Sequence, residues 1–417
     1  MKIALLTFLD VANFGANLQT TSTYNYLKKQ GHQVVAINYE SYQTYWSKKV
    51  RQWKRQLMHQ AMPIQDAAHH NYLMQQLDNI SPSLHTNKQV ANYIKNNHFD
   101  GVVIGSDAVA QHWPIGSTWT IKSFKHRPFW FEPLQQERRF PNPFWGTGFA
   151  DIVPTALLSV SSQNSKYKKF GSRTLGKMAR QLKTMKFLSV RDAWTRDMML
   201  HAEPSLHVEL TPDPVFAFNQ NLESQIPSEH DIRSRFDLPE KYVLIGLKSQ
   251  VYSVDDLDRL NTLFKQQGKE CVAFCIDGVY NYKHNFAYQV PLPISPLDWF
   301  ALIKYASAYI GSNMHPIVSA LTNATPCFSI DNWGMVDFWG NKTKEKKSSK
   351  VFDILSQYGI PEYRTEISLG KCDKNVDEIV DALRKFPIVD VQRISADRVL
   401  RYNKMMQSII DSFIATE

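Results

Sequence analysis

The sequence contains little cysteine and no long apolar run. Among 417 residues there are four cysteines, none in Cys-x-x-Cys spacing, which excludes a disulfide framework. Cys271 and Cys275 flank Val-Ala-Phe in an apolar stretch, where buried thiols are ordinary. No segment reaches the ~18–20 apolar residues of a membrane span, and MKIALLTFLD lacks a small-residue cleavage site. We therefore interpret residues 3–8 as a first strand and expect a cytoplasmic protein without a bound metal.

The sequence also lacks a recognised nucleic-acid-binding motif, although its charge is positive. Lys and Arg number 48 against 39 Asp and Glu, a formal net charge of +9. The excess lies largely in residues 48–56, 122–127 and 342–350, and such runs are typical of solvated surface. Four aromatic residues lie beside or within the first run: Tyr42, Tyr45, Trp46 and Trp53. We expect anionic partners and no nucleic acid, and a peripheral contact with an anionic membrane face stays open.

Strand-like and helix-like segments alternate along the chain. Residues 3–8 are apolar, 16–30 have helical spacing, and 32–38 are apolar again, which indicates one βαβ unit. The alternation continues to about residue 218 and starts again at 242, after a polar segment that contains proline. Alternating strands and helices require parallel sheets covered on both faces. The sequence therefore predicts an α/β protein with two Rossmann-like, doubly wound domains facing a cleft.

The domain boundary follows from the polar segment between the two series. We place an N-terminal domain at 1–220 and a C-terminal domain at 221–390. A last helix, 391–417, has apolar residues along one side, and we expect it to pack back on the domains. Residues 112–150 contain four tryptophans and five prolines with little periodicity. Such a long aromatic loop is usually functional or disordered, and its tryptophan content argues against disorder.

Ligands of open α/β sheets bind beyond the carboxyl ends of strands, and four junctions in this chain qualify. In the first, at 10–20, Asn13 and Gly15 form a turn before a helix whose free N–H groups suit a phosphate or carboxylate. Many loops of this kind bind nothing. In the second, a strand ends in Ser106 and Asp107, and Asp107 is either a catalytic carboxylate or a helix cap.

The third junction places Arg191 directly after an apolar strand. Its guanidinium is either a two-pronged donor for a bound anion or half of a salt bridge with a neighbouring acid. In the fourth junction, GSNMHP, Ser312 or Asn313 can cap a helix, and Pro316 fits the first helical position. His315 then lies in the first turn, where a bound phosphate favours its protonated form. It is either a general acid or a buried, hydrogen-bonded histidine.

These segments, in this order, resemble the polysaccharide pyruvyl transferase family. TFLDVANFGANLQTTSTYNYLKKQGHQVVAINY resembles its first βαβ unit, with an N-aromatic-G-A-x-L-Q loop. VVIGSDAVAQHW, LSVRD, LTPDPVF and YIGSNMHPIVSALTNATPCFSI are similar to its GSDQVW, SVRE, DPT and TxSFHG segments. The likeness spans residues 3–331, and the order of the segments is more specific than any one of them.

The resemblance implies a GT-B-like pair of domains and transfer of pyruvate from phosphoenolpyruvate to a saccharide as a ketal in cell-surface polysaccharide biosynthesis. The saccharide acceptor is lipid-linked or free. No cofactor and no metal is implied, because phosphoenolpyruvate is the donor substrate and protein groups neutralise its charge. The implied roles are donor binding by Arg191, Ser312 and Asn313, acid or phosphate ligand for His315, base for Asp107, and further substrate contacts by Asn13, Gly15 and Ser106.

Several positions depart from the family pattern. The differences are Asn313 and Met314 for a serine and an aromatic residue, Pro316 for a glycine, and Ala108-Val109-Ala110 for Gln-Val-Trp. They leave open a different acceptor sugar or a catalytically silent saccharide-binding relative. A glycosyltransferase that uses a sugar nucleotide is the other alternative. It would use Asp277 or Asp298 for the ribose of its donor.

Overall fold

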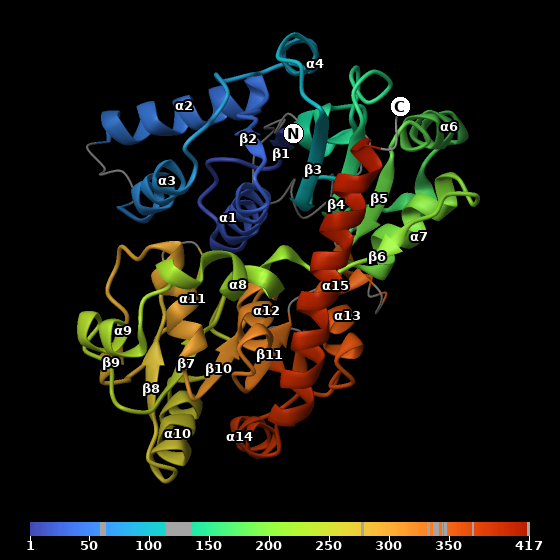
Figure 1. The fold of residues 1–417 in the computed structure, drawn as a ribbon. Coiled ribbons are helices and arrows are strands. Elements are labelled where there is room, and N and C mark those ends of the chain that lie inside the picture. The colour runs from blue at the N-terminus through green and yellow to red at the C-terminus, as the bar shows by residue number, and fades with distance from the viewer. Residues whose placement is uncertain are drawn as a thin grey trace. The chain divides into compact units, whose positions relative to one another are not determined.

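The structure is a computed structural model that describes residues 1–58, 64–113, 136–276, 279–331, 334–336, 342–343, 345, 348–368 and 371–414. The chain divides into two compact units. The first unit consists of Met1–Pro214, Gly334–Ser348 and Leu400–Glu417, and the second of Val215–Trp333 and Ser349–Val399. Each unit contains a sheet flanked by helices (Figure 1).

The first unit is built on a parallel sheet of six strands in the order β2-β1-β3-β4-β5-β6. Ile3 pairs with Val34 on one side and with Gly101 on the other. The central strands are buried on both faces, which explains their nearly continuous apolar sequences. The strands are β1 (Lys2–Leu6), β2 (Gln33–Ala36), β3 (Gly101–Asp107), β4 (Thr155–Val160), β5 (Phe187–Val190) and β6 (Glu209–Leu210).

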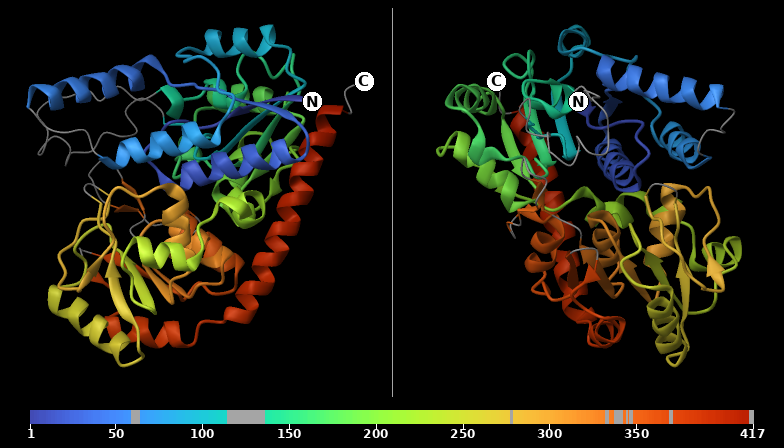
Figure 2. Two further views of the ribbon diagram at one scale, coloured as in Figure 1. Left: turned by 60° about the vertical axis from the view of Figure 1, so that its left-hand side comes forward. Right: turned by 180° about the vertical axis from the view of Figure 1, so that it is seen from behind.

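Helices cover both faces of this sheet, because right-handed crossovers on the two sides of β1 lie on opposite faces. The end of α15 (Ile388–Ile414) packs on β3, where a Cβ on Gly101 would lie 2.2 Å from the ring of Phe413. Figure 2 shows the C-terminal part of α15, which belongs to the first unit, beside the sheet of that unit. The other helices of this unit are α1 (Phe14–Lys29), α2 (Tyr42–Leu57), α3 (Ile64–Gln76), α4 (Asn87–Asn96), α6 (Ser172–Leu182) and α7 (Ala193–Ala202).

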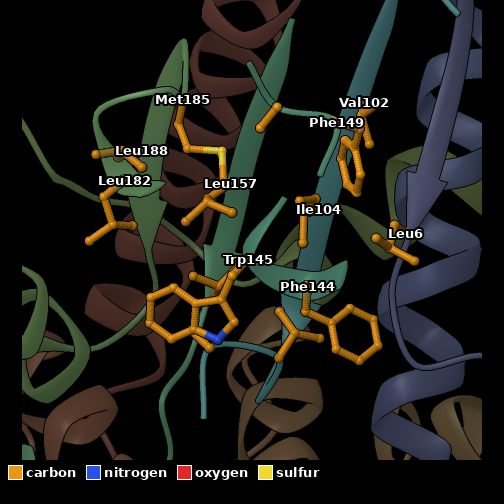
Figure 3. Close-up of a cluster of buried hydrophobic side chains, with 14 of the residues drawn as sticks. Leu6, Val102, Ile104, Phe144, Trp145, Phe149, Leu157, Leu182, Met185 and Leu188 are labelled. Atoms are coloured by element: carbon orange, nitrogen blue, oxygen red, sulfur yellow. The ribbon is translucent and has the colours of Figure 1, made fainter. Parts of the chain in front are cut away.

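The main hydrophobic core of the first unit includes aromatic residues from the predicted loop 112–150. Figure 3 shows Phe144 and Trp145 in one cluster with strand residues such as Ile104. The ring of Phe144 lies edge-on to that of Phe8, 5.0 Å between centroids. Over residues 136–150 the segment forms two 3-10 turns, η1 (Gln136–Arg138) and η2 (Pro143–Trp145). This part of the predicted irregular loop is therefore packed core, and residues 114–135 lie outside the described residues.

The second unit has a sheet of seven strands in the order β15-β14-β11-β10-β7-β8-β9. Neighbouring strands are parallel, except that the edge strand β15 runs antiparallel to β14. The strands are β7 (Tyr242–Gly246), β8 (Glu270–Ala273), β9 (Tyr288–Gln289), β10 (Ala308–Gly311), β11 (Cys327–Asp331), β14 (Arg364–Ser368) and β15 (Lys371–Cys372). The helices are α8 (Phe218–Leu222), α9 (Glu229–Arg235), α10 (Val254–Lys265), α11 (Pro296–Lys304), α12 (Met314–Thr322), α13 (Lys350–Gln357) and α14 (Val376–Arg384).

Two sheets that are parallel except for the edge strand β15, with flanking helices, confirm the predicted α/β fold with two Rossmann-like units. A short antiparallel pair, β12 (Met335–Val336) and β13 (Lys342–Thr343), lies in the segment that returns to the first unit. The sequence alone predicts that this segment belongs to the second domain, 221–390. A local sequence pattern cannot show that residues 334–348 belong to the first unit, because this assignment depends on contacts between distant parts of the chain. Within the described residues, no helix combines the length and the apolarity needed to cross a bilayer.

Candidate functional site

Five polar side chains meet at the carboxyl edge of the first sheet, and we term them the carboxyl-edge cluster. They are Gln19 on α1, Ser106 and Asp107 at the end of β3, Arg191 after β5, and Asp213 after β6. Gln19 binds both Ser106 and Asp213, and Arg191 binds both Asp107 and Asp213. The structure thus brings together three of the predicted site residues, Ser106, Asp107 and Arg191. Ligand sites of parallel sheets are found at this edge.

The end of β3 presents Ser106 and Asp107 through a backbone that few sequences allow. Gly105 has φ +120°, and a Cβ there would lie 2.4 Å from the carbonyl oxygen of Leu158, so glycine is required. Asp107 also has a positive φ, +82°. The hydroxyl of Ser106 donates to the carbonyl of Ser159 at 2.9 Å and accepts from the cluster glutamine at 3.2 Å. Ser106 is buried, and its hydroxyl serves to position other groups of the protein.

Helix α1 carries Gln19 into the cluster. Its cap is Asn13, whose Oδ1 accepts a hydrogen bond from the amide of Ala16 at 3.1 Å. Gly15 lies inside the first helical turn rather than in a turn before the helix. Asn13 and Gly15 were predicted as substrate contacts, and the hydrogen bonds described for the cluster include neither of them. The amide nitrogen of Gln19 donates to Oδ2 of Asp213 at 2.6 Å.

Arg191 is a buried residue with two ion pairs. Its Nη1 donates to Oδ2 of Asp213 at 2.7 Å, and its Nη2 donates to Oδ1 of Asp107 at 3.3 Å. Burial disfavours the charged guanidinium, but the carboxylates of Asp213 and Asp107 outweigh burial and raise the pKa of Arg191. The salt bridge that the sequence left open as an alternative is therefore present. Both terminal nitrogens of Arg191 have carboxylate partners.

The carboxyl-edge cluster holds two carboxylates against one guanidinium. The side chain of Asp107 is 16% exposed and that of Asp213 is 3% exposed, so Asp107 is the carboxylate that a solute can approach. The amide of Ala108 donates to Oδ1 of Asp107 at 2.7 Å, which fixes one of its oxygens. Carboxylate oxygens accept hydrogen bonds from hydroxyl groups and repel anions. The cluster is therefore better suited to a sugar hydroxyl than to a phosphate.

A second group of predicted site residues lies in the second unit, where β10 leads into α12. The backbone amide of Ser312 donates to the carbonyl of Gly246 at 2.9 Å, and its hydroxyl accepts from the amide of Lys248 at 3.3 Å. These bonds join the carboxyl end of β10 to that of β7. A Cβ on Gly311 would lie 2.3 Å from the hydroxyl of Tyr309, so this strand end also requires glycine.

Helix α12 starts without a side-chain cap, contrary to the expectation from the sequence. Asn313 occupies the cap position but has φ +79°, and its side-chain amide donates to the hydroxyl of Tyr280 at 3.2 Å. Pro316 is the third helical residue rather than the first. The backbone N–H groups in the first turn of a helix have no partner within the helix. The missing N–H of Pro316 therefore costs no helical hydrogen bond, and the helix is not broken. The first turn of α12 keeps the partial positive charge of an uncapped helix N-terminus.

His315 is the second residue of α12 and is partly buried. The position agrees with the predicted first-turn placement. Of the two carboxylates named for a sugar-nucleotide donor, Asp298 forms an ion pair with Arg235 and lies on the first turn of α11. Asp277 lies outside the described residues. Among the described residues, no group of three or more His, Cys, Asp or Glu side chains is placed to hold a metal ion.

The segments that form these strand ends match one known family. Residues 13–334, well over half of the chain, match the family model of the polysaccharide pyruvyl transferases. The chain belongs to the polysaccharide pyruvyl transferase family. A comparison of this pyruvyl transferase family member with curated proteins found no match.

Sequence reasoning missed two cluster residues of this pyruvyl transferase family member, Gln19 and Asp213. Both lie in segments that carried the resemblance, Gln19 at the end of NFGANLQ and Asp213 within LTPDPVF. Both side chains are themselves buried in the structure, Gln19 at 1% and Asp213 at 3% exposure. A buried polar side chain needs a hydrogen-bonding partner, so such positions predict a polar cluster even when the partner is not known.

Solved structures with a similar fold include two described as UDP-N-acetylglucosamine 2-epimerases. A candidate enzyme of this kind from Listeria monocytogenes has a TM-score of 0.53 and 12% identity, covering 100% of this chain and 97% of that chain. The enzyme from Rickettsia bellii has a TM-score of 0.50 and 9% identity, with the same coverage of both chains. At such low identity the likeness shows the fold alone, and it agrees with the GT-B-like class predicted for this pyruvyl transferase family member.

Proposed function

We propose that this protein transfers pyruvate from phosphoenolpyruvate to a saccharide, where it forms a ketal in cell-surface polysaccharide biosynthesis. The family match over residues 13–334 carries the proposal. It is supported by the meeting of four family-like segments at one edge of the first sheet, which gives them a shared role. We further propose that the reaction takes place in the cytoplasm, where phosphoenolpyruvate is made, on a free or lipid-linked acceptor.

The first unit is proposed to bind the acceptor. Asp107 is the base for a sugar hydroxyl, because it is the more exposed of the two carboxylates in the cluster. Arg191 pairs with Asp107 and Asp213 and fixes their orientation, so its effect on the substrate acts through Asp107. This role replaces the direct donor clamp inferred from the sequence. Asn13 and Gly15, at the start of α1, are further acceptor contacts. Ser106 contributes indirectly, because its hydroxyl accepts a hydrogen bond from Gln19 and helps to hold the cluster in place.

The second unit is proposed to bind the donor. The uncapped start of α12 offers backbone amides and a partial positive charge to the phosphate of phosphoenolpyruvate. Asn313 is exposed at this point, and Ser312 fixes the strand end behind it. His315, in the same turn, is the proton donor to the methylene carbon or a ligand of the phosphate.

The proposed reaction conserves every atom of the two substrates. A proton from His315 adds to the methylene carbon of phosphoenolpyruvate, and the first sugar hydroxyl bonds to the adjacent carbon while its proton passes to Asp107. The second hydroxyl then bonds to the same carbon as the carbon–oxygen bond to phosphate breaks. One hydroxyl proton restores the histidine and the other leaves with inorganic phosphate. The products are the ketal and phosphate, with no oxidation or reduction.

Donor binding separates the proposal from its alternatives. Thermal unfolding is followed with phosphoenolpyruvate and, separately, with a panel of sugar nucleotides. A ligand at 100 times its Kd stabilises the folded state by about 2.7 kcal/mol, which is a shift of a few degrees in Tm. Stabilisation by a sugar nucleotide instead would identify a glycosyltransferase, and stabilisation by neither would indicate a silent saccharide-binding relative.

Product analysis then tests the reaction itself. The protein is incubated with phosphoenolpyruvate and candidate saccharides, and phosphate release is measured together with the mass of the saccharide. The expected product is a saccharide that carries one pyruvate ketal for each phosphate released. Phosphate release without a ketal would indicate hydrolysis of the donor and would overturn the proposed transfer. Mass spectrometry of the surface glycan from cells with and without this protein would identify the acceptor.

A further inference from the structure

Helix α2 exposes its apolar side chains instead of burying them. Five of them recur at intervals of four, four, three and four residues, and each is between 45% and 61% exposed: Tyr42, Trp46, Val50, Trp53 and Leu57. Each residue of an α-helix is rotated by about 100° from the one before, so these five side chains lie within an arc of about 80°. We term this row the α2 stripe. Met58 and Ile64, just beyond it in the chain, are also exposed.

The opposite side of α2 faces the body of the first unit. Thr44, Lys48 and Gln52 are partly buried there, and Lys48 forms an ion pair with Glu40. Ser41 caps the helix, and its hydroxyl donates to Glu137 at 2.8 Å. Surface helices usually turn their apolar side to the core and their polar side to water. In α2 this arrangement is reversed, so burial within the unit does not explain the α2 stripe.

Positive charge accompanies the α2 stripe. Residues 42–57 contain five Lys and Arg residues and no Asp or Glu. By the same rotation, Lys49 lies at one border of the stripe and Lys54 at the other, and both are exposed. The ammonium group of Lys49 lies 5.6 Å from the centre of the Tyr45 ring. Figures 1 and 2 show α2 at the margin of the first unit, with α3 as its neighbour.

We propose that α2 lies flat on a membrane surface that contains anionic lipids, with the α2 stripe inserted at the level of the headgroups. Trp46 and Trp53 supply the amphipathic rings that favour this depth of a bilayer. Lys49 and Lys54 lie where they meet lipid phosphates, because they border the stripe. The helix does not cross the bilayer. This inference is independent of the reaction proposed above, so vesicle binding and phosphate release can succeed or fail separately.

The charge pattern favours a lipid surface over a second copy of this chain. Two copies that paired through the α2 stripe would bring the lysines at the borders of both stripes close together. Like charges at short distance oppose each other. A bilayer with anionic headgroups supplies the opposite charge along the whole length of the helix and also accepts the indole rings. The aromatic and basic residues of 42–56 leave a membrane contact open from sequence alone, and the exposed stripe now identifies the surface.

Co-sedimentation with vesicles tests the proposal on the full-length protein. Wild-type protein is mixed with vesicles of phosphatidylcholine alone and with vesicles that also contain phosphatidylglycerol. We expect binding at least about tenfold tighter to the anionic vesicles, weakened by added salt. Trp46→Ser/Trp53→Ser should reduce binding to the anionic vesicles about tenfold or more, and Lys49→Gln/Lys54→Gln should remove most of the preference for anionic lipid.

Val389→Ser/Leu400→Ser is the matched control, because these side chains are at least as exposed on α15 and lie outside the basic segment. This variant should bind vesicles like the wild type. Circular dichroism checks that each variant is folded. Wild-type binding that is absent or equal for both vesicle types would overturn the proposal, and so would full binding by the tryptophan variant. Sedimentation velocity adds one further overturning outcome: a wild-type dimer that the tryptophan variant converts to a monomer would assign the stripe to a second copy.

Discussion

Gln19 and Asp213 share a hydrogen bond of 2.6 Å between the amide nitrogen of one and a carboxylate oxygen of the other, although 194 positions separate them. Asp213 also accepts from Arg191, which in turn donates to Asp107. The partly exposed carboxylate of Asp107 therefore depends on three distant segments, directly on Arg191 and through it on Asp213 and Gln19. Changes at any of these positions should affect activity through the orientation of Asp107, in addition to any effect on stability.

Asp107→Asn should remove the proposed base while keeping the size of the side chain. General base catalysis contributes about 10²–10⁴-fold to a rate, so we expect phosphate release in the presence of acceptor to fall by at least about 100-fold. Donor-dependent thermal stabilisation should persist, because the donor is proposed to bind in the second unit. An Asp107→Asn protein with wild-type turnover would exclude this residue as the base.

His315→Ala should abolish phosphate release from phosphoenolpyruvate and leave Tm close to the wild-type value, because the histidine is partly buried and near a helix end. His207→Ala is the control, since the side chain of His207 is 89% exposed. A large loss of Tm in the His315 variant alone would identify a structural histidine. Retained turnover would exclude it as the acid.

Arg191→Ala should destabilise the protein strongly, because it leaves two carboxylates in the cluster without their cation. Removal of one partner of a buried ion pair typically costs about 3–5 kcal/mol. Arg191→Lys should recover part of this loss, since a single ammonium group cannot reproduce the two-pronged contact. Urea unfolding measures both. Arg393→Ala, which breaks an exposed pair with Asp390, should change stability by less than about 1 kcal/mol. Equal stability of the two alanine variants would contradict the buried pairing.

Gly105→Ala and Gly176→Ala should act in opposite directions. At Gly105, φ is +120° and a Cβ would lie 2.4 Å from a backbone oxygen, so this variant should fold poorly and lose activity. Gly176 lies inside α6, where an added Cβ would meet nothing within 4 Å, and alanine there should add up to about 1 kcal/mol. Thermal melts compare the two. Wild-type stability of the Gly105 variant would show that the strand end tolerates a side chain.

His69 should make stability depend on pH. Burial lowers the pKa of His69 to about 4, and its Nδ1 accepts a hydrogen bond from the amide of Asn17 at 2.8 Å. The unfolded chain has the ordinary value of about 6.5, so between pH 6.5 and 4 the unfolded state binds a proton that the folded state does not. The free energy of unfolding should therefore fall as pH is lowered through this window, by roughly 3 kcal/mol in total.

His69→Gln isolates this contribution, because glutamine keeps an acceptor for Asn17 and does not titrate. Urea unfolding at pH 7, 5.5 and 4 should show a shallower loss of stability in the variant than in the wild type. His207→Gln is the exposed control and should follow the wild type. Parallel pH profiles for wild type and His69→Gln would show that His69 is not the source of the loss.

Much of the candidate site was accessible from sequence because catalytic residues of parallel sheets follow strands. Asp107, Arg191 and His315 were found in this way, and each lies at a strand end or at a helix start. A salt bridge of Arg191 was one of the alternatives, but its partner Asp213 was not predictable, since Asp213 comes from a segment whose position depends on the order of strands. No helix was predicted for residues 42–57, and only the structure shows that the apolar side of α2 faces away from the core.

The amino-acid sequence by itself determined the alternation of strands and helices, the glycines at strand ends and the membership of the chain in its family. These features depend on local backbone preferences and on the order of segments, both of which are written directly in the residues. The tertiary structure alone decided which charges pair, which loop aromatics become core and which side of α2 meets water. Those outcomes depend on burial and on contacts between residues far apart in the chain, and no local pattern contains them.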